Sequence, residues 1–335
     1  MKARGVWAAL LVVGCSSSPE ERPGEAPLAV NGEVDSAEQY PMVVGLVTKK
    51  GQYLSRCSGT LVAPNLVLTA RHCIADSPGG FVTCGQAPLG AAYPPENVLV
   101  TQKHVQTDEP ADYVSVSRTE LAPGGDDTCG FDFAAVVLVG TGFGSGAPTA
   151  APRLDFPVAP GELVTAVGYG NTGSGSIGTR RFKPGVAVSC VGSACGSIPA
   201  AESEWVSADD AFCQNDSGAA ALDAEGRLVG TVSRGINPCT TPVLGAMPAW
   251  KAWLQQVGAQ AATEGGYAPP AWVTGSPPPP VDAGTDAPLP EPTVSARDDG
   301  GGCAASARRT RGNHWLLSAL GFLFLASSRG RRNRL

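Results

Sequence analysis

The stretch Cys57-Ser58-Gly59-Thr60-Leu61-Val62-Ala63-Pro64-Asn65-Leu66-Val67-Leu68-Thr69-Ala70-Arg71-His72-Cys73 is the most specific part of the sequence. Two apolar runs flank a Pro-Asn turn, which predicts a β-hairpin that ends at a histidine and a cysteine. A disulfide between the two terminal cysteines would close this loop and fix the His72 imidazole. A lone histidine is more often structural or at the surface, so the role of His72 depends on what accompanies it.

A second stretch, Phe212-Cys213-Gln214-Asn215-Asp216-Ser217-Gly218, has the residue types of a nucleophile loop. A serine hydroxyl attacks a carbonyl poorly unless a base removes its proton and backbone N–H groups receive the oxyanion. Asp-Ser-Gly is also a common turn sequence, which by itself would give Ser217 no chemical role. His72 upstream supplies the base that such a serine requires.

A carboxylate lies between these two stretches, where Asp132 opens the apolar run Phe133 to Leu138. A buried carboxylate without a partner is costly, so an aspartate at the start of a buried strand needs a cation or a donor. The other interpretation is an exposed aspartate at a strand start, like the neighbouring Asp126 and Asp127. Together with the histidine and the serine, Asp132 would complete a Ser-His-Asp set.

The three motifs resemble those of the trypsin/chymotrypsin-like serine proteases, and the resemblance runs from Ala29 to about Val257. Ala29-Val30-Asn31-Gly32 is similar to the mature N-terminus of that family. Gly168-Tyr169-Gly170 is similar to the Gly-Trp-Gly that follows the first strand of its second barrel. Ser233-Arg234-Gly235 is similar to its substrate-aligning Ser-Trp-Gly.

The resemblance implies an all-β fold of two antiparallel six-stranded barrels with a C-terminal helix and a disordered Pro-rich flank. The composition agrees, because 43 glycines and 29 prolines in 335 residues favour many turns. Trp250, Trp253 and Leu254 have helical spacing and predict that the C-terminal helix covers Pro248 to Val257.

The resemblance also implies a serine endopeptidase mechanism. Ser217 would attack the scissile carbonyl, His72 would transfer the proton, and Asp132 would set the imidazole tautomer. The N–H groups of Asn215 and Ser217 would hold the oxyanion, and Ser233 would donate a hydrogen bond to the aspartate.

The family's primary specificity pocket corresponds to Ala211, Phe212, Ser233, Arg234 and Gly235. Ala211 at its base carries no charge and Phe212 narrows the cavity, so we expect cleavage after small or medium apolar residues. Arg234 stands where the family has an aromatic wall, and we expect it to favour acidic residues further upstream in the substrate.

The family is activated by cleavage, after which the new α-amino group pairs with the aspartate before the nucleophile. The corresponding residues here are Ala29 and Asp216, so the resemblance implies a zymogen. Leu28 precedes the cut position in place of Arg or Lys, and the activating protease is therefore not expected to be trypsin-like.

Ten cysteines indicate an oxidising, exported environment. The resemblance pairs Cys213 with Cys239 across the specificity pocket, and the ends of the first stretch pair with each other. The sequence leaves the pairing of four further cysteines open. The expected pairs are Cys57–Cys73, Cys213–Cys239, Cys84–Cys129 and Cys190–Cys195.

Other ligand classes receive little support from the composition. With three histidines and no Cys-x-x-Cys or His-x-x-x-His spacing, we expect neither a metal nor a cofactor. The net charge of −6, with no basic stripe outside the C-terminal tail, gives no signal for nucleic acid. The expected partners are a protein or peptide substrate and an activating protease, and the protein is expected to be a monomer.

The N-terminus has the features of an export signal. Lys2 and Arg4 precede the apolar run Val6 to Val13, which is too short to span a bilayer. Val12-Val13-Gly14-Cys15 resembles a bacterial lipobox, in which Cys15 becomes the lipidated first residue. An ordinary signal peptide is the alternative.

The resemblances and the composition together divide the chain into five expected segments. These are a lipoprotein signal peptide (1–15), a tether or propeptide (16–28), a protease domain (29–260), a Pro-rich linker (261–302) and a hydrophobic tail (303–335). The tail, with Gly301-Gly302-Cys303 before it and terminal arginines, resembles the sorting tails of myxobacterial surface proteins. A permanent membrane anchor is the alternative. We expect export to the cell envelope, at the outer membrane or cell surface, or release outside the cell.

Asn215 keeps other functions open, because the family has glycine at this position. Its N–H must point into the oxyanion hole, in a backbone geometry that glycine tolerates best. Asparagine tolerates positive φ better than most residues, with strain of order 1–3 kcal/mol. Loss of one oxyanion donor would lower turnover roughly 100- to 1,000-fold. A non-catalytic binding protein on the same scaffold, or a single-use self-cleaving surface protein, therefore remains an alternative.

Overall fold

The computed structural model describes residues 32–78, 82–171, 177–208, 211–213, 215–236 and 240–275. These residues all lie in the first of two units, Met1–Pro280, and the second unit is Val281–Leu335. Cys15 with its lipobox, Ala29, Cys239, most of the linker and the C-terminal tail lie outside the described residues. Within the described residues, no helix is long and apolar enough to cross a membrane.

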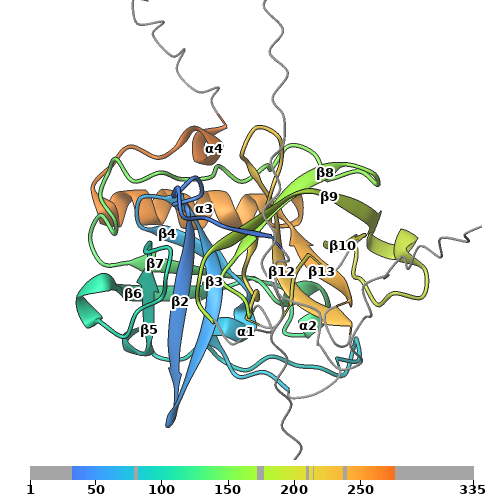
Figure 1. The fold of residues 1–335 in the computed structure, drawn as a ribbon, viewed down its shortest axis with the longest axis horizontal. Helices are drawn as coiled ribbons and strands as arrows, with labels where there is room; N and C mark the ends of the chain where they lie inside the picture. Colours follow the sequence, from blue (N-terminus) through green and yellow to red (C-terminus); the bar gives the residue numbers. More distant parts are fainter. Residues whose placement is uncertain are drawn as a thin grey trace, which may run out of the picture. The chain divides into compact units, whose positions relative to one another are not determined.

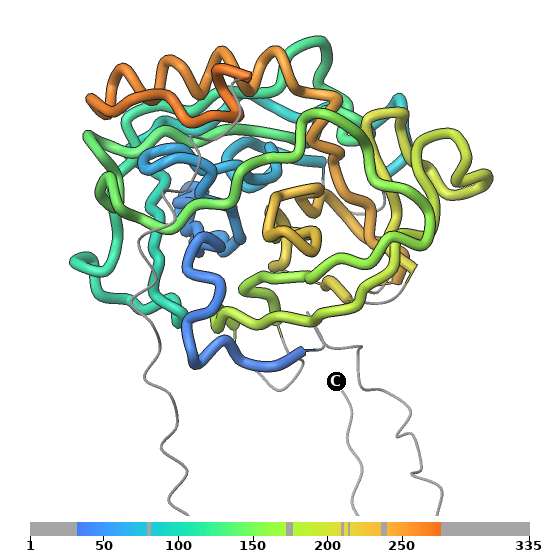
Figure 2. The backbone as a smooth tube through the Cα atoms, turned by 90° about the horizontal axis from the view of Figure 1, so that it is seen from above, coloured from blue at the N-terminus to red at the C-terminus, as the bar shows by residue number. Residues whose placement is uncertain are grey.

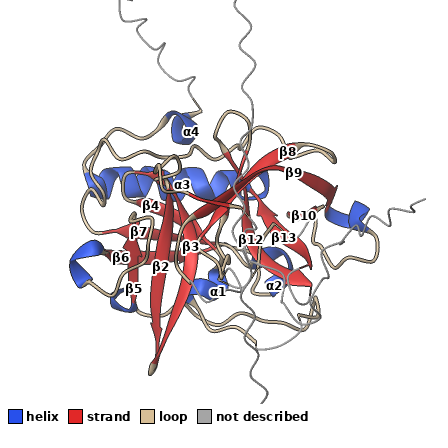
Figure 3. Cartoon of the chain, in the orientation of Figure 1, coloured by secondary structure: helices blue, strands red, loops and turns tan. Residues whose placement is uncertain are grey.

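Strands dominate the described residues, and they form two closed antiparallel barrels as the sequence predicted (Figures 1 and 3). The strands of the first barrel pair in the order β2-β3-β4-β7-β6-β5. The hairpin of β2 and β3 extends beyond the rest of this barrel (Figure 1). These strands are β2 (Val43–Lys50), β3 (Tyr53–Ala63), β4 (Leu66–Thr69), β5 (Val98–Thr101), β6 (Val114–Leu121) and β7 (Ala134–Leu138).

The second barrel repeats this strand order, as β8-β9-β10-β13-β12-β11, and closes through pairing of β8 with β9. A short strand, β1 (Glu33–Val34), pairs with the start of β9, at Arg181 and Phe182. The barrel strands are β8 (Leu163–Gly168), β9 (Arg181–Val191), β10 (Glu204–Ser207), β11 (Ala220–Leu222), β12 (Leu228–Ile236) and β13 (Thr240–Ala246).

The predicted C-terminal helix is present and is longer than expected. It begins as the 3-10 turn η4 (Met247–Trp250) and continues as α3 (Lys251–Gly265), which runs past the expected domain end at residue 260. Figure 2 shows α3, in orange, along one edge of this unit. Gly266, with φ of 67°, ends the helix in the left-handed conformation that glycine tolerates.

A short helix, α4 (Ala271–Thr274), then packs back on α3. Gly258 makes this contact possible, because a Cβ there would lie 2.6 Å from the Trp272 ring. The Trp272 indole N–H also donates to the carbonyl of Val62, 3.1 Å away. The folded residues therefore extend to the end of α4. The remaining short helices are α1 (Arg71–Ile74), α2 (Thr128–Phe131), η1 (Pro95–Asn97), η2 (Pro110–Asp112) and η3 (Gly192–Cys195).

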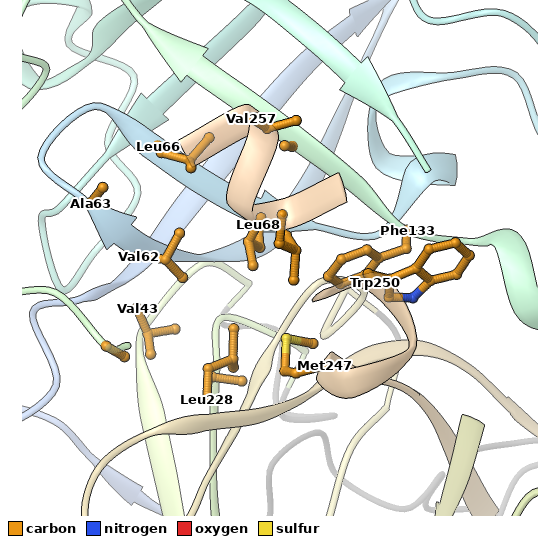
Figure 4. Packing of buried hydrophobic residues seen from close by; sticks show 14 of the residues in the cluster. Val43, Val62, Ala63, Leu66, Leu68, Phe133, Leu228, Met247, Trp250 and Val257 are labelled. Carbon is orange, nitrogen blue, oxygen red and sulfur yellow. The ribbon is translucent and has the colours of Figure 1, made fainter. Parts of the chain in front are cut away.

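One buried apolar cluster joins residues of both barrels to the C-terminal helix (Figure 4). Leu68 and Phe133 come from the first barrel, Leu228 from the second, and Trp250 and Val257 from the C-terminal helix. Phe133 stacks on Trp250 with ring centroids 5.9 Å apart. Because Phe133 follows Asp132 directly, this stacking fixes the backbone that carries the candidate acid.

A buried polar contact ties the two barrels together at a second point. The Arg180 guanidinium, fully buried before β9, pairs with Asp35 at 2.7 Å. It also donates to the carbonyl of Gln102 (3.0 Å) and to the hydroxyl of Tyr169 (3.0 Å). That hydroxyl donates to the carbonyl of Lys103 at 2.8 Å. Residues from the N-terminal segment and both barrels therefore share one cation.

Candidate active site

The barrel topology brings His72 and Asp132 together from distant parts of the sequence. Strands β4 and β7 are antiparallel neighbours, with Thr69 opposite Ala134. His72 lies just after β4, in α1, and Asp132 lies just before β7. The end of one strand is beside the start of the other, so both side chains emerge at the same end of the barrel.

Asp132 receives three contacts that suit a negative charge. The His72 ring Nδ1 lies 2.7 Å from Oδ2, and the His72 backbone N–H donates to Oδ1 at 2.9 Å. The Ser233 hydroxyl, on β12 of the second barrel, donates to Oδ2 at 2.7 Å. Burial by itself raises the pKa of Asp132, but His72 and these hydrogen bonds outweigh it and hold the pKa below its usual value.

These contacts assign the imidazole tautomer. An ionised carboxylate can only accept hydrogen bonds, so the proton between the two side chains belongs to His72 Nδ1. The Nε2 atom of a neutral imidazole is then an acceptor. A base in this state can take a proton from a serine hydroxyl.

The loop that carries Ser217 comes from the second barrel and rests on the first. Ser58, on β3, donates its backbone N–H to the carbonyl of Ser217 at 2.8 Å. Gly218 donates to the carbonyl of Val232 at 2.8 Å, which ties the loop to β12. A Cβ on Gly218 would lie 2.0 Å from the Ser58 carbonyl oxygen, so only glycine permits this approach. Ser217 itself is partly exposed.

Asn215 has a left-handed backbone conformation. Its φ of 69° lies in the left-handed region, where asparagine is more tolerant than most residues. The adjacent Asp216 is fully buried, and its carboxylate accepts backbone N–H groups of Gly170 (2.8 Å) and Cys213 (3.0 Å). The expected partner of Asp216, Ala29, lies outside the described residues.

Replacing Asn215 with glycine should leave kcat unchanged or raise it severalfold, because glycine adopts positive φ without strain. Replacing it with valine should lower kcat, because a β-branched residue at positive φ is strongly disfavoured. Steady-state turnover of the two variants measures the effect. Glu38→Gly is a matched control: Glu38 also has positive φ (52°) but lies outside the site, so turnover should not change. A large fall in kcat for Asn215→Gly would contradict the interpretation.

The residues of the expected specificity pocket differ in how accessible they are. Ala211 and Phe212 are buried, and both belong to the apolar cluster of the second barrel. Arg234 is partly buried and Gly235 is exposed. The two residues expected at the base of the pocket, Ala211 and Phe212, are therefore apolar and uncharged.

Arg234, which we expected to favour acidic residues in the substrate, has an acidic partner inside the protein. Its guanidinium forms a two-pronged ion pair with the buried Glu204, with N–O distances of 2.6 and 2.9 Å. It also donates to the carbonyl of Pro199 at 2.6 Å. The charge of Arg234 is therefore paired with that of Glu204 inside the protein. Sequence alone did not signal Glu204 as its partner.

Three of the expected disulfides are present among the described residues. Cys213 is disulfide-bonded as well, and its expected partner Cys239 lies outside the described residues. Two groups, around Cys57–His72–Cys73 and Cys84–Asp127–Cys129, have the spacing of metal ligands. Their cysteines are joined by disulfides and offer no thiolate, so neither group has the donors of a metal site. The pairs are Cys57–Cys73, Cys84–Cys129 and Cys190–Cys195.

A lysine that sequence reasoning missed touches the backbone of the candidate base. Lys50 Nζ, at the end of β2, donates to the carbonyl of His72 at 2.8 Å and lies 5.5 Å from the Tyr93 ring centre. Burial lowers the pKa of Lys50, opposed by the charges of Asp76 and Asp132. A lysine beside a hairpin turn normally indicates an exposed tip, so the sequence carried no signal for this contact.

A hollow of about 480 Å³ lies next to the turn that carries Asp132. Its lining includes the Cys84–Cys129 disulfide, Asp127 and residues 198–201. Both oxygens of Asp127 accept backbone N–H groups, from Cys129 and Ala87. The rest of the lining is mainly apolar or backbone.

Two antiparallel barrels, with a buried aspartate bonded to a partly exposed histidine on one and a serine loop on the other, define a trypsin/chymotrypsin-like scaffold. The chain belongs to the trypsin family, whose model, described as Trypsin, matches residues 29–252. A crystal structure of a scabies mite inactivated protease paralogue has the same fold, with a TM-score of 0.54 at 19% sequence identity. That likeness covers 68% of this chain and 99% of the paralogue.

Two curated relatives agree with this family. The chain is 30% identical over 157 residues to a trypsin of Saccharopolyspora erythraea, which covers 44% of this chain and 57% of the relative. It is 34% identical over 96 residues to human chymotrypsin-like elastase family member 3B, which covers 28% of this chain and 35% of the relative. The chain thus spans less than two thirds of the length of each of these relatives.

Proposed function

We propose that this protein is an exported serine endopeptidase that cleaves peptide bonds through an acyl-enzyme. Ser217 attacks the scissile carbonyl while His72 Nε2 takes its proton, and a bond forms between Ser217 Oγ and the carbonyl carbon. His72 then gives the proton to the leaving amine, and water releases the acyl group by the reverse sequence. The N–H groups of Asn215 and Ser217 stabilise the oxyanion.

The observation that carries the proposal is the set of contacts at Asp132. Its carboxylate binds both the backbone and the ring of His72 and also accepts from Ser233. A buried carboxylate that holds an imidazole by Nδ1 stabilises the imidazolium formed during proton transfer. An aspartate with only a structural role would not need to fix the ring in this orientation.

The apolar base of the pocket supports a preference for small or medium apolar residues before the cleaved bond. Ala211 has no charge to pair with Arg or Lys, and the mainly apolar hollow beside Cys129 suits apolar residues further upstream. Peptides with Ala or Val at the cleaved position should have a kcat/KM at least about tenfold above Arg or Lys peptides. A peptide library measures the ratio. A dominant Arg or Lys preference would refute this pocket assignment, and so would equal use of all residues.

The proposal includes activation by cleavage between Leu28 and Ala29. The buried Asp216, next to the oxyanion residue Asn215, supports it, because an incoming amine would add a positive charge beside this carboxylate. The cut would separate the protease from an acyl chain on Cys15, so the active form would carry no N-terminal lipid. The zymogen would be held at the cell envelope, and the tail beyond Cys303 would decide where the active form remains.

One experiment tests both parts. The full chain, expressed in an exporting bacterium, is treated with a fluorophosphonate probe, and the labelled species is subjected to N-terminal sequencing. We expect labelling of Ser217, none in Ser217→Ala, and an N-terminus at Ala29. A folded species that begins at Ala29 but is not labelled would overturn the catalytic proposal. A labelled species that begins at acylated Cys15 would overturn the activation proposal alone.

A second candidate is a protease-fold binding protein with little turnover, and its support is the strain of a non-glycine residue at positive φ in Asn215. The related fold of a protein described as an inactivated protease paralogue means that the fold by itself does not establish activity. The two candidates differ in what restoring glycine does. If the wild type is not labelled and Asn215→Gly is, the binding-protein function is supported.

A further inference from the structure

The turn that carries Asp132 is fixed by residues other than His72. This turn is α2 (Thr128–Phe131). Within it, Cys129 and Gly130 have non-helical backbone geometry, and Gly130 has φ of 94°. A Cβ on Gly130 would lie 2.9 Å from the Cβ of Ala201, so the turn is pressed against the second barrel. The backbone N–H and the carbonyl of Gly130 both form hydrogen bonds with side chains of the second barrel. The N–H donates to Glu204 Oε1 at 2.8 Å, and the carbonyl accepts from Ser203 Oγ at 3.0 Å.

Glu204 is in turn fixed by Arg234. The glutamate side chain is 2% exposed and the arginine side chain 10%. Both carboxylate oxygens face the guanidinium, and Oε2 also accepts the N–H of Ala201 at 2.8 Å. The two residues lie on β10 and β12, and β13 lies between these strands. The Glu204 carboxylate thus connects the second barrel to the backbone of Gly130, two residues before Asp132.

Arg234 also contacts the same turn directly. Its Nη1 donates to the carbonyl of Thr128 at 3.3 Å and lies 3.3 Å from the Ser233 hydroxyl. That hydroxyl donates to Asp132. The Glu204–Arg234 ion pair therefore contacts both the turn that carries Asp132 and Ser233, the residue that donates to Asp132.

We propose that the Glu204–Arg234 ion pair positions Asp132 for catalysis, because it fixes Ser233 and the turn that carries Asp132 relative to each other. The inference rests on the proposed peptidase function. Glu204 is buried and does not touch the reacting atoms, so its effect passes through the placement of the Asp132 carboxylate against His72. Loosening the turn lengthens this contact and lowers kcat, while the binding of substrate is largely unchanged.

The test uses Glu204→Gln, which keeps the shape and removes the charge. We expect kcat to fall about 10- to 100-fold, because small displacements of a catalytic group have effects of this size. KM should change less than about twofold, because Glu204 is not exposed to substrate. Adding Arg234→Met to this variant should lower kcat little further, because the pair acts as a unit.

Glu162→Gln is a matched control in the same barrel. Glu162 also forms a two-pronged pair with an arginine, Arg153 (2.6 and 3.2 Å). Like Glu204, it accepts a backbone N–H three residues earlier, from Ala159. It does not contact the turn of Asp132 in the described residues. Glu162→Gln should therefore affect stability but not kcat.

A spectroscopic readout separates positioning from stability. The proton between His72 Nδ1 and Asp132 should give a strongly downfield NMR signal, which a longer contact moves upfield. Glu204→Gln should shift or broaden this signal, and Glu162→Gln should not. Unchanged kcat with an unchanged signal in Glu204→Gln would refute the proposal, as would equal changes in the control. If Glu204→Gln does not fold, Arg234→Lys, which keeps the charge but loses the two-pronged geometry, is judged by kcat and by the NMR signal.

The two proposals fail in different ways. A wild type that the fluorophosphonate probe does not label refutes the peptidase function. The NMR signal can still be read in that protein, so the effect of Glu204 on the Asp132–His72 contact is tested independently.

Discussion

Asp132→Asn is expected to lower kcat about 10,000-fold while the protein remains folded. The asparagine fits the same space, but its amide group can present N–H donors to His72 Nδ1 and to the Ser233 hydroxyl, both of which now donate to the carboxylate. The imidazole would then carry its proton on Nε2, where it cannot accept one from Ser217. Steady-state kinetics on an apolar peptide measures the loss.

Asp126→Asn is the control for this substitution. Asp126 lies in the same segment but is exposed, so its replacement should leave kcat within about twofold. If Asp132→Asn retained more than a tenth of wild-type activity, Asp132 would not be the residue that orients the base.

The same variant should also reveal a pH-dependent contribution to stability. The folded pKa of Asp132 is below its usual value, so the folded state favours the carboxylate. This contribution is fully present above the unfolded pKa of about 3.9 and is lost as pH falls through the lower, folded value. The difference in unfolding free energy between wild type and Asp132→Asn should therefore be larger at neutral pH than in acid. Urea unfolding across a pH series measures it, and a constant difference would contradict the assigned contacts.

Arg180→Met is expected to lower the free energy of unfolding by about 3–5 kcal/mol, more than any other substitution named above. The reason is that it leaves the buried Asp35 carboxylate without its cation. The carbonyl of Gln102 and the hydroxyl of Tyr169 lose a donor at the same time. For a domain of this size, the loss corresponds to a fall in Tm of roughly 6–20 °C. Calorimetry or denaturant unfolding measures it.

Arg56→Met is the matched control for this prediction. Arg56 also pairs with an aspartate, at 3.0 Å, but Asp108 is 92% exposed. Exposed pairs contribute about 0–1 kcal/mol, so Arg56→Met should have a small effect. Equal effects of the two substitutions would mean that the buried Arg180–Asp35 pair contributes no more to stability than an exposed pair.

The fold was predictable because the stretches that carry the family resemblance are local. The hairpin from Cys57 to His72 and the strand after Asp132 have apolar runs that any strand pairing must bury. The residues that support the site had no such signal. Arg180 and Asp35 are 145 positions apart in sequence, and Arg and Asp are common at surfaces. Only the closed barrels determine which of these charges are buried together.

The length of the C-terminal helix could not be predicted for a different reason. After Val257 the sequence is rich in small residues, so it lacks the periodic large apolar residues that mark a helix. In the structure Ala261 and Ala262 are buried, and Gly258 lies against Trp272. Small residues are needed there because α4 packs closely, which becomes clear only in three dimensions.

The division of the proposed reaction centre between two barrels has a consequence for partial unfolding. His72 and Asp132 come from the first barrel, whereas Ser217 and Ser233 come from the second. Neither barrel alone carries both a base and a nucleophile. A chain in which both barrels have closed but have not yet docked would keep its circular-dichroism signal and have no turnover. Activity should therefore disappear at lower denaturant concentration than secondary structure, and return last on refolding.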